Sequence, residues 1–223
     1  MQPRYSRNVP ALSEDQCALL EAKRVAVIGC GGLGGHIIEL LARIGVGHIV
    51  CVDGDVFDET NLNRQLLSQD ALLDTSKALA AVERIQCINS RISCEGYPCF
   101  LKQDNAASLI QGCDLVFDAL DNVDARRILE QACEQENIPY VHGAISGWYA
   151  QAAVCLPGQK LTRMLYPEDV VIKDKSVLSF TPALCASVQT SLGIKVLLGL
   201  PVTSGTLYFY DLLNQELDHI PMV

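Results

Sequence analysis

The chain has 223 residues, of which 49% are hydrophobic, enough apolar material for the sizeable core of one domain. Its formal net charge of −9 argues against nucleic acid as a main partner. The most apolar stretch, residues 184–200, is interrupted by Gln189, Ser191 and Lys195. We therefore predict a core or subunit-interface helix there, and no membrane partner.

The N-terminus and the cysteines indicate a reducing compartment. Residues 1–5 lack the apolar core of a secretion signal, so we expect a cytoplasmic protein. Several of the ten cysteines, such as Cys51, Cys113 and Cys155, lie within apolar segments. Because no two cysteines have C-x-x-C spacing, we predict no structural zinc.

A glycine-rich loop lies between a predicted strand and a predicted helix. Residues 24–28 are apolar and rich in β-branched side chains, as in a buried strand, and residues 37–44 repeat apolar side chains at helical spacing. Glycine permits a tight turn close to phosphate, and the helix N-terminus attracts an anion. This context predicts a nucleotide site. The loop glycines are Gly29, Gly31, Gly32 and Gly34.

Polar residues follow two further predicted strands. The strand at residues 48–52 ends at Asp53, at the spacing of an acid that binds ribose hydroxyls, and the strand at residues 113–120 ends at Asp121. Strand ends of a doubly wound sheet gather at one edge, so we expect both acids beside the glycine loop. The nearby polar residues expected at the same edge are Asp55, Asn61, Arg64, Gln65, Lys77 and Asn122.

Two cations and a carboxylate favour ATP over NAD as the nucleotide. Arg64 and Lys77 can offset the charge on an α-phosphate under attack, and Asp121 can hold Mg²⁺. Hydride transfer has no comparable need for this cluster. Simpler interpretations remain: Arg64 and Lys77 as helix-surface charge, Asp121 as the cap of a helix over residues 123–137, and Asp55 as a structural residue. The expected cap of the helix that carries Lys77 is Asp74 or Thr75.

The motifs and their order resemble the ThiF/MoeB/HesA adenylyltransferases, relatives of the ubiquitin-activating enzymes. The resemblance extends from about residue 4 to the C-terminus. It implies ATP-dependent adenylation of the C-terminal glycine of a small ubiquitin-like sulfur-carrier protein with a Gly-Gly end, in thiamine or molybdenum/tungsten cofactor biosynthesis. The matching motifs are Arg4-Tyr5-Ser6-Arg7, Gly29-Cys30-Gly31-Gly32-Leu33-Gly34, Asp53-Gly54-Asp55, Asn61-Leu62-Asn63-Arg64-Gln65, Lys77 and Asp121-Asn122.

The resemblance also implies a role for each matching residue. Gly32 lies against the nucleotide and Asp53 holds the ribose. Asp121 binds Mg²⁺ and orients the α-phosphate, with Asn122 beside it. Arg7 reaches across a homodimer to the partner's phosphates; its simpler interpretation is a solvated terminal charge. The residues implied to contact phosphates within the chain are Asn61, Arg64 and Lys77.

The chain departs from the family pattern in its cysteines. Many members carry two C-x-x-C pairs in the second half, and this chain carries none. Some relatives use a cysteine in a crossover loop, but the corresponding residues 157–179 contain no cysteine, and Cys185 lies within the helical pattern that follows. We therefore expect adenylation alone, without a catalytic cysteine and with sulfur delivered by a separate donor protein.

The predicted architecture is a single domain over residues 1–223, a Rossmann-like doubly wound, mostly parallel sheet with antiparallel strands added at the C-terminal side. Strands are expected at residues 139–144 and 148–156, and a closing hairpin at residues 206–210 and 217–220 with a turn at Asn214-Gln215. The basic residues of the crossover loop could guide an acidic carrier or form a solvated surface. They are Lys160, Arg163, Lys173 and Lys175.

Two alternative functions remain open. The enzyme could adenylate another carboxylate, on a modified tRNA or a peptide, although the acidic composition weighs against tRNA. The chain could also be a catalytically inactive or NAD-binding Rossmann protein, which would leave Arg64, Lys77 and Asp121 without a task. The four histidines, His142 among them, are scattered, and we assign none a catalytic role.

Overall fold

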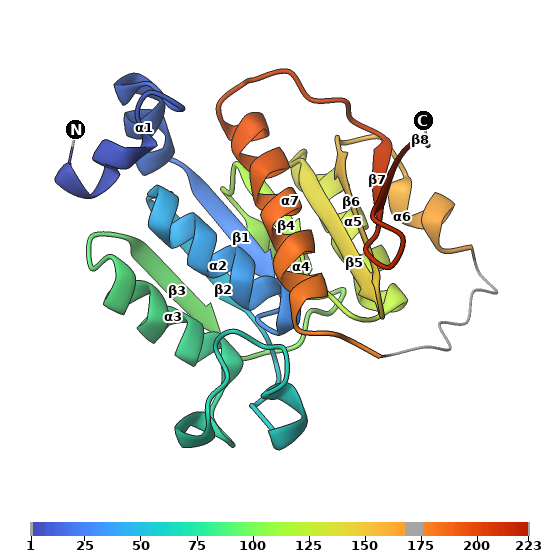
Figure 1. The fold of residues 1–223 in the computed structure, drawn as a ribbon, viewed down its shortest axis with the longest axis horizontal. Helices are drawn as coiled ribbons and strands as arrows, with labels where there is room; N and C mark the ends of the chain where they lie inside the picture. Colours follow the sequence, from blue (N-terminus) through green and yellow to red (C-terminus); the bar gives the residue numbers. More distant parts are fainter. Residues whose placement is uncertain (1, 168–175, 223) are drawn as a thin grey trace.

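A computed structural model describes residues 2–167 and 176–222 (Figure 1). One eight-stranded sheet, in the order β3-β2-β1-β4-β5-β6-β7-β8, forms its centre. Strands β3, β2, β1, β4 and β5 pair in parallel, and β6, β7 and β8 pair antiparallel. The predicted mostly parallel sheet with antiparallel C-terminal strands is confirmed. The strands are β1 (Arg24–Ile28), β2 (His48–Val52), β3 (Ser93–Tyr97), β4 (Leu115–Asp118), β5 (Tyr140–Ser146), β6 (Tyr149–Cys155), β7 (Thr206–Asp211) and β8 (Glu216–Pro221).

Helices cover both faces of the sheet. Val25 and Val27 of β1 pack in one apolar cluster with α2, α3 and α7, while Ala26 and Ile28 pack in a second cluster with α4, α5 and α6 (Figure 1). Burial on both faces explains why the central strands are continuous apolar runs rather than alternating ones. The helices are α1 (Glu14–Glu21), α2 (Gly32–Ile44), α3 (Lys77–Ile88), α4 (Ala106–Ile110), α5 (Val123–Glu136), α6 (Leu161–Leu165) and α7 (Phe180–Leu197), with 3-10 turns η1 (Pro3–Asn8), η2 (Glu59–Asn61) and η3 (Asp70–Leu72).

Two predicted boundaries are wrong for local hydrogen-bonding reasons. The strand predicted over residues 113–120 is only Leu115–Asp118, because the Cys113 N–H bonds back to the Ile110 carbonyl and the chain joins the sheet two residues later. The cap of α3 is Ser76 rather than Asp74 or Thr75, since its hydroxyl accepts the Leu79 N–H at 3.4 Å. Lys77 is therefore the first residue of the helix.

Helix α7 confirms the expected core helix, although it begins at Phe180 rather than at residue 184. It packs against the sheet beside α2 (Figure 1), and its residues Cys185, Ala186 and Gln189 are fully buried. Across the two described ranges, no helix combines the length and apolar character that crossing a bilayer requires. The closing hairpin of β7 and β8 is confirmed, with Gln215 in its turn at a φ of 61°.

Candidate active site

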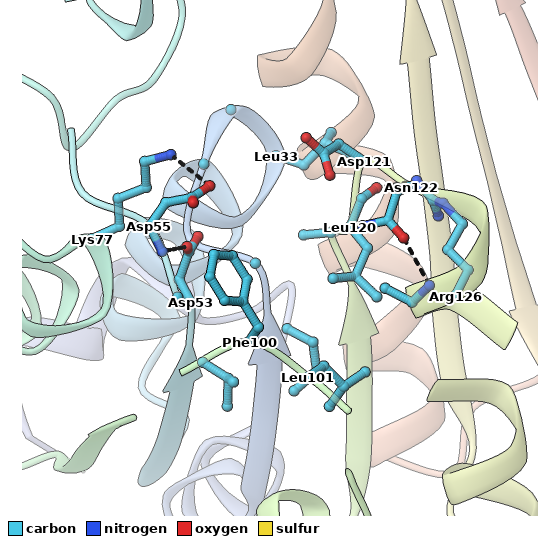
Figure 2. A pocket seen from close by; sticks show the side chains of 18 of the residues that line it. Leu33, Asp53, Asp55, Lys77, Phe100, Leu101, Leu120, Asp121, Asn122 and Arg126 are labelled. Carbon is cyan, nitrogen blue, oxygen red and sulfur yellow. Dashed lines mark hydrogen bonds and ion pairs between the residues drawn. The ribbon is translucent and has the colours of Figure 1, made fainter. Parts of the chain in front are cut away.

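A cavity of about 570 Å³ opens at the carboxyl ends of β1, β2 and β4 (Figure 2). Its volume is typical of sites for small ligands. Strand β1 has β2 on one side and β4 on the other. The order in which successive strands are added to the sheet therefore reverses at β1, although the strands stay parallel. Ligands of doubly wound sheets bind at such a crevice, where the loops after neighbouring strands diverge.

Most of the predicted site residues line this cavity. Figure 2 shows Asp53, Asp55 and Lys77 along one side, with Asp121 and Asn122 across from them. The fold thus brings together residues from the ends of three strands, the glycine loop and the start of α3. The predicted site residues in the lining are Gly29, Gly31, Gly32, Asp53, Asp55, Arg64, Gln65, Lys77, Asp121 and Asn122.

Three predicted residues lie outside the lining. Gly34 packs α2 onto the loop, because a Cβ added to it would lie 1.7 Å from the Gly29 carbonyl oxygen. The Asn61 amide is buried and donates to the Asp58 carboxylate at 3.1 Å, which caps a short 3-10 turn. Arg7 is exposed in η1. The nucleotide contacts predicted for these three residues stay predictions.

Asp53 ties the glycine loop to the end of β2. Its carboxylate accepts the Cys30 N–H at 2.7 Å and the Asp55 N–H at 2.8 Å. Burial raises the pKa of Asp53, and these two backbone hydrogen bonds oppose the shift. On the other side of the loop, a Cβ on Gly29 would lie 2.6 Å from the Ala119 carbonyl oxygen, and its φ of 95° also favours glycine. The loop is therefore fixed to both neighbouring strands.

The two predicted cations have different surroundings. The Lys77 side chain is only 8% exposed, and its Nζ lies 3.4 Å from Oδ2 of the partly exposed Asp55. Its interpretation as helix-surface charge is therefore wrong. Arg64 is half-buried, and its Nη1 donates to the Thr60 carbonyl at 2.7 Å. A buried ammonium needs anions nearby, so Lys77 favours an anionic ligand in the cavity.

Asp121 is an exposed carboxylate at the cavity wall and makes no hydrogen bond or ion pair with any residue that the structure describes. The alternative role of helix cap belongs to Asn122, whose side-chain oxygen accepts the Ala125 N–H at 2.8 Å. The preceding residue, Leu120, is held at both backbone groups: its N–H donates to Asp118 at 3.1 Å, and its carbonyl accepts from Arg126. This turn presents Asp121 to the cavity, with no described residue bound to its carboxylate oxygens.

Gln65 supplies a further sign of a ligand. Its side chain is buried in the cavity wall beside Gly31, and its Oε1 has no hydrogen-bond partner within residues 2–167 and 176–222. An unpaired buried acceptor is costly, so such atoms are rare in native proteins unless a ligand or water meets them.

Comparison with known proteins identifies the family of this chain. The ThiF family matches residues 5–222. The chain belongs to the ThiF family. It is 35% identical over 228 residues to the SAMP-activating enzyme E1 of Haloferax volcanii, covering 98% of this chain and 84% of that protein. It is 32% identical over 226 residues to the sulfur carrier protein adenylyltransferase of Thermus thermophilus, covering 95% and 83%.

Other relatives of this ThiF-family chain are longer. Those whose names combine adenylyltransferase with sulfurtransferase are covered over only 45 to 58% of their length. Among solved structures, E. coli MccB with ATP aligns with a TM-score of 0.83 at 20% identity, covering 100% of this chain and 72% of that one. At that identity the likeness shows a shared fold.

A buried polar network behind the cavity is not predicted by the ThiF motifs. His142 is fully buried, with Nδ1 2.8 Å from Oδ2 of Asp118 and 2.9 Å from Nη1 of Arg126. Its Nε2 lies 3.2 Å from the Gln151 amide and 3.4 Å from the Tyr166 hydroxyl. Arg126 and Tyr166 also line the cavity. A polar residue one helical turn after Asn122 and another within an apolar strand are the signals that could have revealed this network.

Burial and the neighbouring charges together determine the pKa values of Asp118 and His142. Burial alone would raise the pKa of Asp118, but the Arg126 charge and the His142 hydrogen bond outweigh it and lower that pKa. Burial lowers the pKa of His142, and the Arg126 charge adds to this effect. A neutral His142 can donate from Nδ1 to Asp118 and accept the Gln151 amide at Nε2. With His142 neutral, the ion pair of this network is Asp118–Arg126.

Cys185 lies deep in α7, with its thiol 3.3 Å from the Gln151 carbonyl oxygen. Burial raises its pKa to about 12. Such a thiol is not ionised at neutral pH and is a poor nucleophile. Of the predicted basic residues in the crossover loop, Lys160 and Arg163 are exposed at α6, and Lys173 and Lys175 lie outside the described residues.

Proposed function

We propose that this protein adenylates the C-terminal glycine carboxylate of a small ubiquitin-like sulfur-carrier protein. The observation that carries the proposal is the convergence of the glycine loop, Arg64, Lys77 and Asp121 on one cavity. The two relatives matched over more than four fifths of their length support it, because one is named as an activator of SAMP and the other as a sulfur-carrier adenylyltransferase.

The chemistry follows from where the charges lie. The carrier carboxylate attacks the α-phosphorus of ATP, a new carboxyl–phosphorus bond forms, and the bond to the pyrophosphate oxygen breaks. Arg64 and Lys77 would stabilise the negative charge that builds up on the phosphate oxygens, an effect strongest for a cation withdrawn from water, as Lys77 is. Asp53 would accept the ribose hydroxyls through the lone pairs that its two backbone hydrogen bonds leave free.

Asp121 would hold Mg²⁺ at the phosphates, with Asn122 beside it. A carboxylate in the cavity wall with no partner among the described residues fits this role, since Mg²⁺ in nucleotide sites takes one or two carboxylates together with phosphate oxygens and waters. Among the described residues, no group of three or more His, Cys, Asp or Glu side chains is placed to hold a metal ion, so phosphate oxygens and waters would supply the other ligands. When bound, Mg²⁺ would offset the charge of the departing pyrophosphate.

We also propose a homodimer in which Arg7 reaches the partner's phosphates. In support, the η1 segment that presents this exposed arginine is anchored on its own subunit: Asn89 donates to the Tyr5 hydroxyl at 2.6 Å and accepts from Arg4. The carrier would belong to thiamine or to molybdenum or tungsten cofactor biosynthesis. Sulfur would come from a separate donor protein, because the Cys185 thiol is buried and protonated.

Pyrophosphate exchange into ATP tests the proposal. We expect exchange with a carrier that ends in Gly-Gly and none with the same carrier shortened by its last glycine. Exchange driven by a modified tRNA or a peptide instead would favour the alternative carboxylate. The absence of exchange with every substrate, together with NAD binding, would refute adenylation altogether.

A further inference from the structure

Phe100 is an exposed aromatic residue in the cavity wall. It lies on the loop between β3 and α4, and 57% of its surface is accessible. Figure 2 shows its ring beside Asp53, facing the side of the cavity formed by Leu120. None of the motifs named above includes this position, and the chemistry proposed above gives the residue no task.

The Phe100 ring is held in place by the turn at Gly54 and by the hydrogen bonds of its own loop. A Cβ added to Gly54 would lie 2.6 Å from Cγ of Phe100, so the turn between Asp53 and Asp55 can pass beneath the ring only as glycine. The Phe100 carbonyl accepts the Asn105 amide at 3.0 Å, and the Asn105 side-chain oxygen accepts the Lys102 N–H at 2.8 Å. One ring face thus rests on a fixed turn, and the loop that carries it is fixed as well.

The turn beneath Phe100 carries Asp53, the residue proposed to hold ribose. A base attached to that ribose must lie close to it, and the aromatic ring of Phe100 lies beside Asp53. The cavity lining also includes apolar side chains, among them Val52, Leu101 and Ile128. We propose that Phe100 is the base-stacking residue of the nucleotide site, an inference that rests on the proposed use of ATP.

Stacking on an aromatic ring requires only the flat face of a base. Phe100 would therefore raise affinity for a nucleoside triphosphate over inorganic triphosphate, which lacks a base. Loss of one aromatic platform weakens nucleic-acid binders by roughly ten- to a hundredfold per base. The same range is expected here for ATP.

Calorimetric titration with magnesium ATP and with inorganic triphosphate tests the inference. Phe100→Leu should weaken ATP binding about ten- to a hundredfold and leave triphosphate binding unchanged, whereas Phe100→Trp should keep wild-type affinity for both. Tyr97→Leu serves as the matched control, since this aromatic is 38% exposed three residues earlier and lies outside the lining.

Each contrary outcome has its own meaning. ATP binding by Phe100→Leu within twofold of wild type would overturn the stacking role alone. An equal loss of ATP and triphosphate binding would also overturn it, since the loop and not the ring would then be responsible. A wild-type protein that binds no ATP would overturn both this inference and the proposed function.

Cys99 offers a second measurement in the same place. It is partly exposed and lines the cavity next to Phe100, whereas Cys87 is exposed on α3, away from the lining. Saturating ATP should protect Cys99 but not Cys87 from alkylation by iodoacetamide, as read by mass spectrometry. Equal labelling of Cys99 with and without ATP would place the base elsewhere and overturn the inference.

Discussion

The cavity wall and the network behind it use charged residues in opposite ways. In the wall, the Asp121 carboxylate is exposed and without a partner among the described residues. Behind it, Asp118 and Arg126 are buried and paired with each other and with His142. Both acids lie at the end of β4. An exposed carboxylate without a described partner, such as Asp121, is available to bind a ligand. A buried and paired charge, such as Asp118 or Arg126, instead holds the neighbouring residues in position.

Arg126 joins the two regions, since its guanidinium holds both Asp118 and the Leu120 carbonyl beside Asp121. Removing this cation would leave the Asp118 carboxylate buried and unpaired. We therefore divide the site into residues whose loss reduces stability and residues whose loss reduces activity only. The following substitutions test that division.

The largest expected effect is the loss of the buried ion pair. Arg126→Ala should lower the free energy of unfolding by about 3–5 kcal/mol, because an unpaired charge would remain in the core. Urea denaturation measures the change. Arg43→Ala is the matched control, since Arg43 is 59% exposed in its pair with Glu39 and should cost less than about 1 kcal/mol. If both variants lose less than about 1 kcal/mol of the free energy of unfolding, the buried Asp118 carboxylate does not depend on Arg126.

Asp121→Ala should show the reverse pattern. Pyrophosphate exchange should fall by about 10²–10³-fold, as when one electrostatic stabiliser of a transition state is removed. Stability should change by less than about 0.5 kcal/mol, because the carboxylate has no described partner to lose. Asp70→Ala, at an exposed acid outside the lining, should leave both quantities unchanged. A fully active Asp121→Ala protein would remove this residue from the mechanism.

Local patterns in the sequence predict the cavity wall well. The glycine loop, Asp53 and Asp121 each follow a buried apolar strand, and the parallel sheet brings strand ends together without further information. The edge strand β3 escapes prediction because its residues, Ser93–Tyr97, are partly exposed and mostly polar. Helix α4 has only five residues, too few for a recognisable period.

The network and Phe100 could not be predicted in the same way. Arg126, His142 and Tyr166 come from α5, β5 and the end of α6, and only tertiary packing makes them neighbours. A single polar residue in an apolar strand, such as His142, has no pattern that identifies its partner. Phe100 looks like an ordinary loop aromatic until Gly54 is seen beneath it.

His142 makes the network sensitive to pH. Burial and the Arg126 charge lower the pKa of His142 in the folded protein. The imidazole is therefore protonated near pH 6.5 in the unfolded chain but stays neutral at that pH in the folded protein. Stability should therefore fall as pH drops below about 6.5, by at most about 1.4 kcal/mol per pH unit, until the folded pKa is reached. His142→Gln should flatten this slope in urea denaturation between pH 7 and 5. His36 also has a lowered pKa, so His36→Gln measures its separate share. An unchanged slope in His142→Gln would show that the buried imidazole is not the titrating group.

Cys185 should give the smallest effect, although its thiol lies 3.3 Å from the Gln151 carbonyl oxygen. Its thiol is near Gln151 of the network, but burial keeps it protonated, with a pKa of about 12. Replacing it by alanine retains a small apolar side chain, so Cys185→Ala should change pyrophosphate exchange by less than about twofold. Non-reducing electrophoresis with the carrier and ATP should show no adduct in either protein. A carrier adduct in the wild type that disappears in Cys185→Ala would show that the helix opens during turnover and that this buried sulfur takes part in the reaction.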